Sequence, residues 1–239
     1  MQNGLYVSLS AQLALSHRLE TVAANVANMN TVGYRAESVT FETQIARAGA
    51  ARLSYVTPAA TTLNLQSGGL TKTDNPLDVA VQGDGWLAIQ TGGQTAYTRD
   101  GRMQISATGA LENLNGDPVL DAGGAPILLD PAAGPPAIAS DGMIAQNGKQ
   151  VGALGLYSID PGAQLKRARG SAVIPNKPAS PILDFTRDGV VQGFTEGANV
   201  NPIQEMAKLI TLTRTFDNVN SEVNQTEASL QDAIKELGA

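Results

Sequence analysis

The 239-residue sequence contains no cysteine, which removes thiol nucleophiles, disulfides, cysteine-ligated zinc and iron–sulfur clusters from consideration. It contains a single histidine, His17, so few of the side chains that usually serve acid–base catalysis or metal binding are present. We therefore predict no catalytic residue, no metal ligand and no cofactor. His17 lies two positions from the apolar stripe of a predicted helix, and we expect its side chain on solvated helix surface.

Charge is also scarce, because charged residues make up 16% of the chain and the formal net charge is −6. No basic cluster is long enough to follow a phosphate backbone, so a nucleic-acid partner is not expected. The sequence has no run of 18 apolar residues and no basic start followed by an apolar stretch. Neither a membrane span nor a cleaved secretory signal is therefore predicted.

Aromatic residues are few, with four Phe, five Tyr and one Trp, whereas 25 Gly and 12 Pro favour turns. The middle of the chain alternates short β-prone runs with turn dipeptides such as Asn115-Gly116 and Asn147-Gly148. This texture predicts a mainly antiparallel β-rich domain at residues 76–196, after an extended connector at residues 35–75. Strands or parts of strands are predicted at residues 77–81, 86–90, 95–98, 102–106, 118–120, 127–129, 143–146 and 151–159.

Both ends of the chain have the apolar spacing of helices. Near the amino end, apolar residues step by four, three, four and three positions, which predicts a helix at about residues 3–28. Near the carboxyl end, Asn201 can cap a helix and Pro202 suits its first position, and a heptad pattern then continues to Leu237. The stripe of this predicted helix, residues 202–237, needs a partner helix. The amino-terminal helix could cover part of it, and either the middle of the chain or neighbouring copies would cover the rest.

The predicted fold class is thus mixed α and β, with long terminal coiled-coil-forming helices flanking a mainly antiparallel β domain. Residues 1–34 and 197–239 are expected to form one discontinuous helical domain. The predicted assembly interface consists of Leu5, Leu15, Leu19, Val22, Asn25, Val26, Asn28, Asn30, Asn199, Asn201, Glu205, Met206, Leu209, Leu212, Phe216, Val219, Val223, Leu230 and Leu237.

The asparagines in this set have two interpretations. Asparagine is favoured at helix caps and turns for local reasons alone. Its amide can also fix the register between helices of adjoining subunits. The sequence is consistent with both interpretations.

Three aspartates, Asp100, Asp141 and Asp188, could be read as clustered carboxylates of a hydrolase. Each immediately precedes a glycine, however, and Asp-Gly in a β context indicates a turn first.

Several segments carry a resemblance to a known family. They are Ala24–Tyr34 (ANVANMNTVGY), Asn75–Trp86 (NPLDVAVQGDGW), Tyr97–Gly101 (YTRDG), Val191–Gly193 (VQG) and Gly197–Met206 (GANVNPIQEM). In order and placement they resemble the bacterial flagellar rod and hook proteins over nearly the whole chain. Within that family, the opening Leu5-Tyr6-Val7 and Asn28-Met29-Asn30 are most similar to proximal rod subunits.

The resemblance implies export by the flagellar type III apparatus without a cleaved signal. It also implies that terminal helices of many copies pack into a tubular core in the periplasm, with the β domain outside. The partners would be copies of the chain and other flagellar axial proteins. The first hypothesis is therefore a structural rod subunit of the basal body that catalyses nothing. The alternatives are a distal rod or hook subunit, a β-domain binding module such as an adhesin, and a periplasmic enzyme.

Overall fold

The computed structural model describes residues 2–48 and 51–237, which fold as two compact units. The helical unit comprises Met1–Ala27, Glu37–Leu63 and Asn201–Ala239, and the β body comprises Asn28–Ala36 and Asn64–Val200. Each unit is thus discontinuous in sequence.

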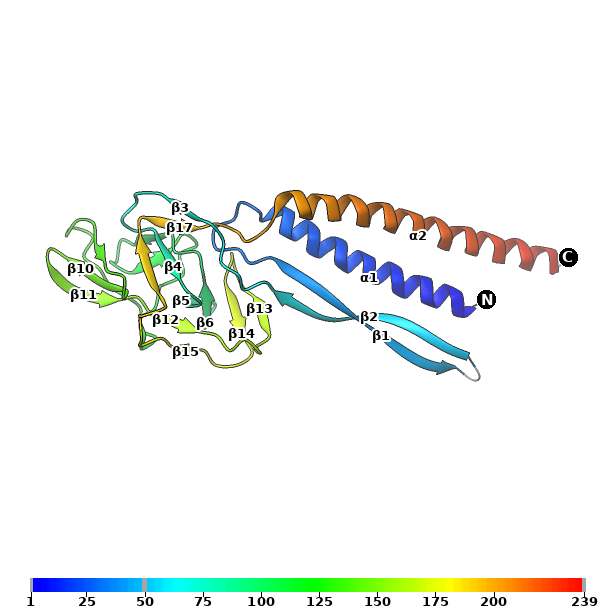
Figure 1. Ribbon diagram of the computed structural model, residues 1–239, viewed down its shortest axis with the longest axis horizontal. Helices are drawn as coiled ribbons and strands as arrows, with labels where there is room; N and C mark the ends of the chain where they lie inside the picture. The colour runs from blue at the N-terminus through cyan, green and yellow to red at the C-terminus, as the bar shows by residue number, and fades with distance from the viewer. Residues whose placement is uncertain (1, 49–50, 238–239) are drawn as a thin grey trace. The chain divides into compact units, whose positions relative to one another are not determined.

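The helical unit contains two helices and a hairpin. Helix α1 spans Gln2–Ala27 and helix α2 spans Pro202–Leu237, so both predicted terminal helices are confirmed. Within the unit, α1 packs against α2 on one side and against the hairpin on the other (Figure 1). Among the described residues, neither helix combines the length and the hydropathy that crossing a membrane requires.

The hairpin is formed by strands β1 (Glu37–Ala48) and β2 (Ala51–Leu63). They pair antiparallel from Glu37 opposite Leu63 to Ala48 opposite Ala51, with a register shift between Thr40 and Phe41. The sequence predicts only an extended connector here, because no Asn-Gly or Asp-Gly turn marks the hairpin. Phe41 lies opposite Pro58, which has no backbone N–H to donate, and the shift falls at this point.

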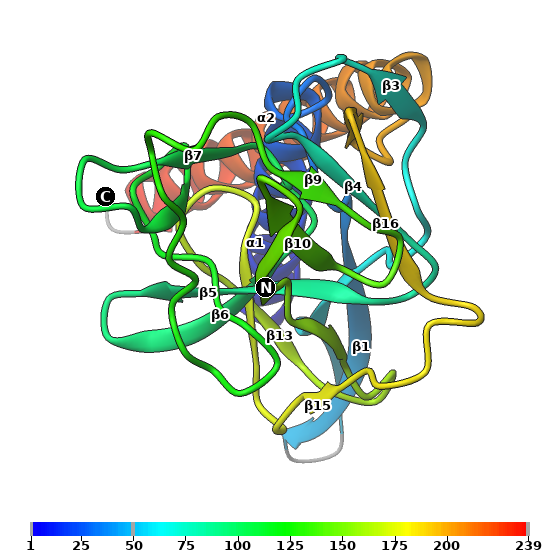
Figure 2. The same cartoon turned by 90° about the vertical axis from the view of Figure 1, so that its left-hand side faces the viewer.

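The β body contains the other fifteen strands, and all of its strand pairs are antiparallel. Its largest sheet has the order β13-β14-β6-β5-β12-β15, and a three-stranded sheet has the order β11-β10-β9. Figure 2 shows the long β5–β6 hairpin of the larger sheet. The strands are β3 (Leu70–Lys72), β4 (Val79–Gln82), β5 (Trp86–Thr91), β6 (Gln94–Thr98), β7 (Met103–Ile105), β8 (Leu111–Asn113), β9 (Ala137–Ile138), β10 (Met143–Gln146), β11 (Lys149–Ala153), β12 (Leu156–Ser158), β13 (Leu165–Arg167), β14 (Val173–Pro175), β15 (Ser180–Pro181), β16 (Gly189–Gln192) and β17 (Phe194–Glu196).

The predicted strands of the β body are mostly confirmed, with two corrections. Residues 118–120 and 127–129 form isolated bridges, such as Ile89 with Val119, rather than strands. The single strand predicted at residues 151–159 is wrong, because the chain breaks into β11 and β12 around Gly155. A Cβ at Gly155 would lie 2.5 Å from the backbone of Asp121, so the chain crosses too closely there for any other residue.

The core of the β body is made of aliphatic side chains from several sheets. Val79 of β4, Leu87 and Ile89 of β5, Leu111 of β8 and Ile144 of β10 are each at most 1% exposed. The core therefore relies on short β-branched and leucine side chains, in keeping with the few aromatic residues.

Candidate assembly site

The apolar stripes predicted on the two helices include two residues that are buried within the helical unit. Val22 of α1 is 6% exposed and Leu212 of α2 is 8% exposed. The other described residues of these stripes are only half-buried within one chain, so part of their apolar surface is uncovered. The half-buried members are Leu15, Leu19, Val26, Leu209, Phe216, Val219 and Val223.

The remaining apolar residues of the predicted interface lie at its ends. Met206 is 43% exposed, so it faces away from the seam. Leu5, Leu230 and Leu237 lie within α1 and α2, and their side chains are outside the described part of the structure.

A buried polar contact links the two helices to the hairpin. Asn25 is 2% exposed, its Oδ1 accepts the Glu37 N–H at 2.9 Å, and its Nδ2 donates to the Glu37 carbonyl at 2.9 Å. The same Nδ2 lies 3.2 Å from Oε2 of Glu205 on α2, whose Oε1 accepts from Lys208 at 2.6 Å. Asn25 therefore fixes the register of α1 against both β1 and α2 within the chain.

The other predicted asparagines also have partners inside their own unit or lie at its surface. Asn201 Oδ1 accepts the Gln204 N–H at 3.2 Å, which confirms its predicted role as the cap of α2. Asn199 accepts the Ala36 N–H at 2.6 Å and donates to the Asn64 carbonyl at 2.7 Å. Asn28 accepts from the Thr31 hydroxyl at 3.1 Å, and Asn30 is exposed.

Two apolar stripes lie on the outer faces of the helices, and apart from Met206 their residues were not part of the predicted interface. On α2, Ile203 is 81% exposed and Ile210 is 56% exposed, and with Met206 they step by three and four residues along one face. On α1, Leu9 is 47% and Leu13 is 56% exposed. The signal was present in the sequence as a second apolar period, offset from the heptads.

The β body contains a buried ionic cluster that sequence reasoning missed. The Glu196 carboxylate is fully buried and lies 2.7 Å from Arg35 Nη2 and 3.3 Å from Arg99 Nη1. Both guanidinium groups stand near the indole of Trp86, at 5.7 Å and 5.3 Å from its centroid. Burial lowers the pKa of the Arg99 guanidinium, and the Glu196 charge partly offsets that effect. This buried cluster has two cations for one carboxylate.

The backbone also converges on this buried cluster. The Gly68 N–H donates to Glu196 Oε1 at 2.8 Å, and the Gly33 N–H donates to the Glu196 carbonyl at 2.7 Å. Arg99 Nη2 donates to the Gly83 carbonyl at 2.8 Å. Glu196 therefore ties together four segments that are far apart in sequence.

The aspartates considered above for hydrolysis take local roles. Asp100 forms a bidentate ion pair with Arg102, at 2.9 Å and 2.7 Å. Asp141 accepts the Met143 N–H in a turn, and Asp188 accepts the Asp84 N–H at 2.7 Å. Among the described residues, no group of three or more potential ligand side chains is placed to hold a metal ion.

Comparison with known proteins identifies the class. Residues 5–35 match the family model for flagella basal body rod protein, and residues 80–146 match the flagellar hook protein FlgE/F/G D1 domain. Residues 191–237 match the flagellar basal body rod FlgEFG protein C-terminal model. These matches place the chain among the flagellar rod and hook proteins.

Relatives that match this chain over its full length identify its family within that class. The chain is 47% identical to the flagellar basal-body rod protein FlgF of Mesorhizobium japonicum and 47% identical to that of Rhizobium meliloti, covering 100% of this chain and 99% of each relative. It is 33% identical to the FlgF of Caulobacter vibrioides, covering 100% of this chain and 99% of that relative. The chain belongs to the flagellar basal-body rod protein family and is a structural subunit of the rod. This confirms the resemblance that the sequence shows, including its likeness to proximal rod subunits.

The three matched regions meet in the buried cluster. Arg35 belongs to the first region, Trp86 and Arg99 to the second, and Glu196 to the third. The segments that identify the family are therefore those that close the β body around one carboxylate.

Proposed function

We propose that this chain is an axial subunit of the proximal rod, which polymerises through its terminal helices and catalyses no reaction. It assembles with copies of itself and with other flagellar rod proteins. The proximal position is supported by Leu5-Tyr6-Val7 and Asn28-Met29-Asn30, the sequence features most similar to proximal rod subunits.

The observation that carries this proposal is the uncovered apolar surface of the helical unit. Ile203, Met206 and Ile210 expose one face of α2 that no described part of the chain covers. The first 17 residues of the sequence contain no Asp, Glu, Lys or Arg, and Leu9 and Leu13 are exposed there. Apolar helix faces with few charges are typical of surfaces that become buried between subunits.

We further propose that the half-buried heptad residues of α2 form a coiled-coil seam that is completed by neighbouring subunits in the rod. The seam within one chain leaves Phe216, Val219 and Val223 only half-buried. Packing of further helices along these positions would complete their burial. We also propose export through the flagellar type III apparatus without a cleaved signal, into a rod that lies in the periplasm, as the resemblance to the family implies.

The proposal is tested with Ile203→Asp and Ile210→Asp, expressed in cells that lack the natural chain. Both side chains are exposed, so the free subunit should keep its thermal stability, whereas a charge at a subunit interface should prevent incorporation. The matched control is Thr215→Asp, an exposed position on another face of α2. Purified basal bodies should contain the control and lack both isoleucine variants. Normal amounts of both variants in basal bodies would refute assembly through this face.

A further inference from the structure

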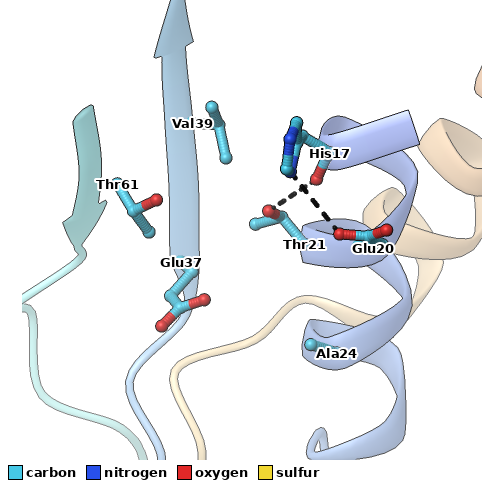
Figure 3. Close-up of a pocket in the computed structure, with 7 residues that line it drawn as sticks. All are labelled: His17, Glu20, Thr21, Ala24, Glu37, Val39 and Thr61. Carbon is cyan, nitrogen blue, oxygen red and sulfur yellow. Dashed lines mark hydrogen bonds and ion pairs between the residues drawn. The ribbon is translucent and has the colours of Figure 1, made fainter. Parts of the chain in front are cut away.

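A groove of about 490 Å³ separates α1 from the β1–β2 hairpin in the helical unit. Figure 3 shows its two walls, with His17, Glu20, Thr21 and Ala24 on α1 and the hairpin residues opposite. The hairpin wall consists of Glu37 and Val39 of β1 and Thr61 of β2.

The described lining of the groove is more acidic than basic. Among the described residues it includes the carboxylates of Glu20 and Glu37 and no lysine or arginine. His17 Nδ1 lies 3.6 Å from Glu20 Oε2, and the Glu20 side chain remains 71% exposed. Ala24 and Val39 supply apolar surface. The groove thus suits an apolar segment that ends in a cation.

The outer face of α2 has that composition. Ile203, Met206, Ile210 and Arg214 step by three, four and four residues, so they share one face, here called the outer α2 stripe. Arg214 is exposed and has no ion pair with any residue that the structure describes. It lies on the side of α2 that faces away from the seam residue Leu212.

The register between α1 and α2 determines which α1 residues lie beside Arg214 along the helix axis. Asn25 contacts Glu205 at 3.2 Å and Gln12 contacts Asn220 at 3.3 Å, which aligns α1 and α2 antiparallel. Between these two contacts, Arg214 is level with the α1 segment around His17. A second copy, placed alongside with the same polarity and at the same height, would therefore bring its Arg214 to the groove.

We propose that the groove receives the outer α2 stripe of a second copy of this chain, with Arg214 beside Glu20. This inference rests on the proposed function, because it specifies how two subunits meet in the rod. The groove and the outer α2 stripe lie on opposite sides of the α1–α2 pair. The contact is therefore head-to-tail, which is the kind that continues from copy to copy around an axis.

Charge reversal tests the contact in basal bodies. Glu20→Arg and Arg214→Glu should each lower recovery of the chain about fivefold, because a like-charge contact replaces an ion pair. The double variant should return recovery to within about twofold of the natural chain, since the pair is restored in the opposite sense. The matched control is Arg18→Glu, which makes the same change of charge as Arg214→Glu at an exposed α1 residue outside the groove lining and should incorporate normally.

The absence of cysteine allows a direct test between copies. Two chains with different tags, one Glu20→Cys and the other Arg214→Cys, should form a mixed disulfide in basal bodies, whereas Arg18→Cys with Arg214→Cys should not. Single reversals that incorporate like Arg18→Glu, a swap that fails to restore recovery, or no mixed disulfide would overturn the contact while leaving the rod function intact. If the tagged natural chain is itself missing from basal bodies, the proposed function fails and this inference with it.

Discussion

At the scale of single residues, Glu196 is the buried carboxylate that pairs with two buried arginines of the β body. It is fully buried between the Arg35 and Arg99 guanidinium groups, which makes their charges tolerable inside the protein. Replacing one member of such a cluster is costly because the remaining charges stay buried without their partner. The carboxylate thus stabilises the fold mainly by neutralising cations that the sequence already contains.

We expect Glu196→Gln to lower the free energy of unfolding by about 3–5 kcal/mol. Urea unfolding monitored by the fluorescence of Trp86, the only tryptophan, measures this at the cluster itself. The control Glu112→Gln, at a half-buried residue with no ion pair among the described residues, should cost under about 1 kcal/mol. Equal losses in the two variants would contradict the role given to Glu196.

Two buried tyrosines predict how stability depends on alkaline pH. Burial raises the pKa of the Tyr97 and Tyr157 phenols, whose rings lie 5.4 Å apart. The unfolded chain loses these protons near about pH 10, whereas the folded protein retains them to higher pH. The contribution to stability is therefore complete below about pH 10 and is lost as the pH rises through the folded pKa values.

The test of this pH dependence is Tyr97→Phe, which removes one of the two titrations. The free energy of unfolding in urea, measured in steps above about pH 9, should fall less steeply for the variant than for the natural chain. Other alkaline titrations are common to both proteins, so they cancel in the comparison. Parallel slopes would show that Tyr97 does not contribute in this way.

At the scale of elements, the sequence predicts those features that depend on local spacing. The cap at Asn201, Pro202 at the first position and the heptads together predicted α2 as residues 202–237, and the structure has the same bounds. The strands before and after Asp-Gly and Asn-Gly turns were likewise predicted from the sequence. The β1–β2 hairpin was not predicted as a hairpin, because its register depends on pairing between whole strands and no turn motif marks it.

Contacts between distant segments could not be predicted. Asn25 was named for its position at the end of a helix, but its partners, Glu37 and Glu205, depend on how three elements meet. Arg35, Arg99 and Glu196 come from three separate segments, and nothing near each of them in sequence indicates burial. The outer stripe of α2 was overlooked because the stronger heptad pattern accounts for the same helix.

A substitution at Phe216 tests whether α2 is the element through which subunits polymerise. Its ring is half-buried at a heptad position between Leu209 and Val223. Phe216→Asp removes the ring and places a charge in the seam, changes that each cost up to a few kcal/mol when fully buried. The exported subunit should keep a folded β body and fail to enter the rod. Thr211→Asp adds the same charge at an exposed position away from both the seam and the outer α2 stripe and should incorporate normally, and recovery of Phe216→Asp in basal bodies at that level would contradict the assignment.

At the scale of the whole molecule, the division into two units predicts that the β body folds without the terminal helices. Its boundaries matter, because the β body includes Asn28–Ala36 as well as Asn64–Val200. A fragment limited to residues 75–193 would omit Arg35, Glu196 and the β3–β17 pair. Arg99 would then be left near Trp86 without its carboxylate.

The expected result is a cooperative thermal transition for residues 28–200, in which residues 37–63 serve as a connecting segment. Residues 75–193 should melt at least about 10 °C lower, because losing the carboxylate of a buried ion cluster costs about 3 kcal/mol or more. Circular dichroism and Trp86 fluorescence should report the same midpoint for the longer fragment, as a single cooperative unit requires. Equal midpoints for the two fragments would show that the buried cluster is dispensable. A longer fragment without a cooperative transition would show that the β body depends on the helical unit for its fold.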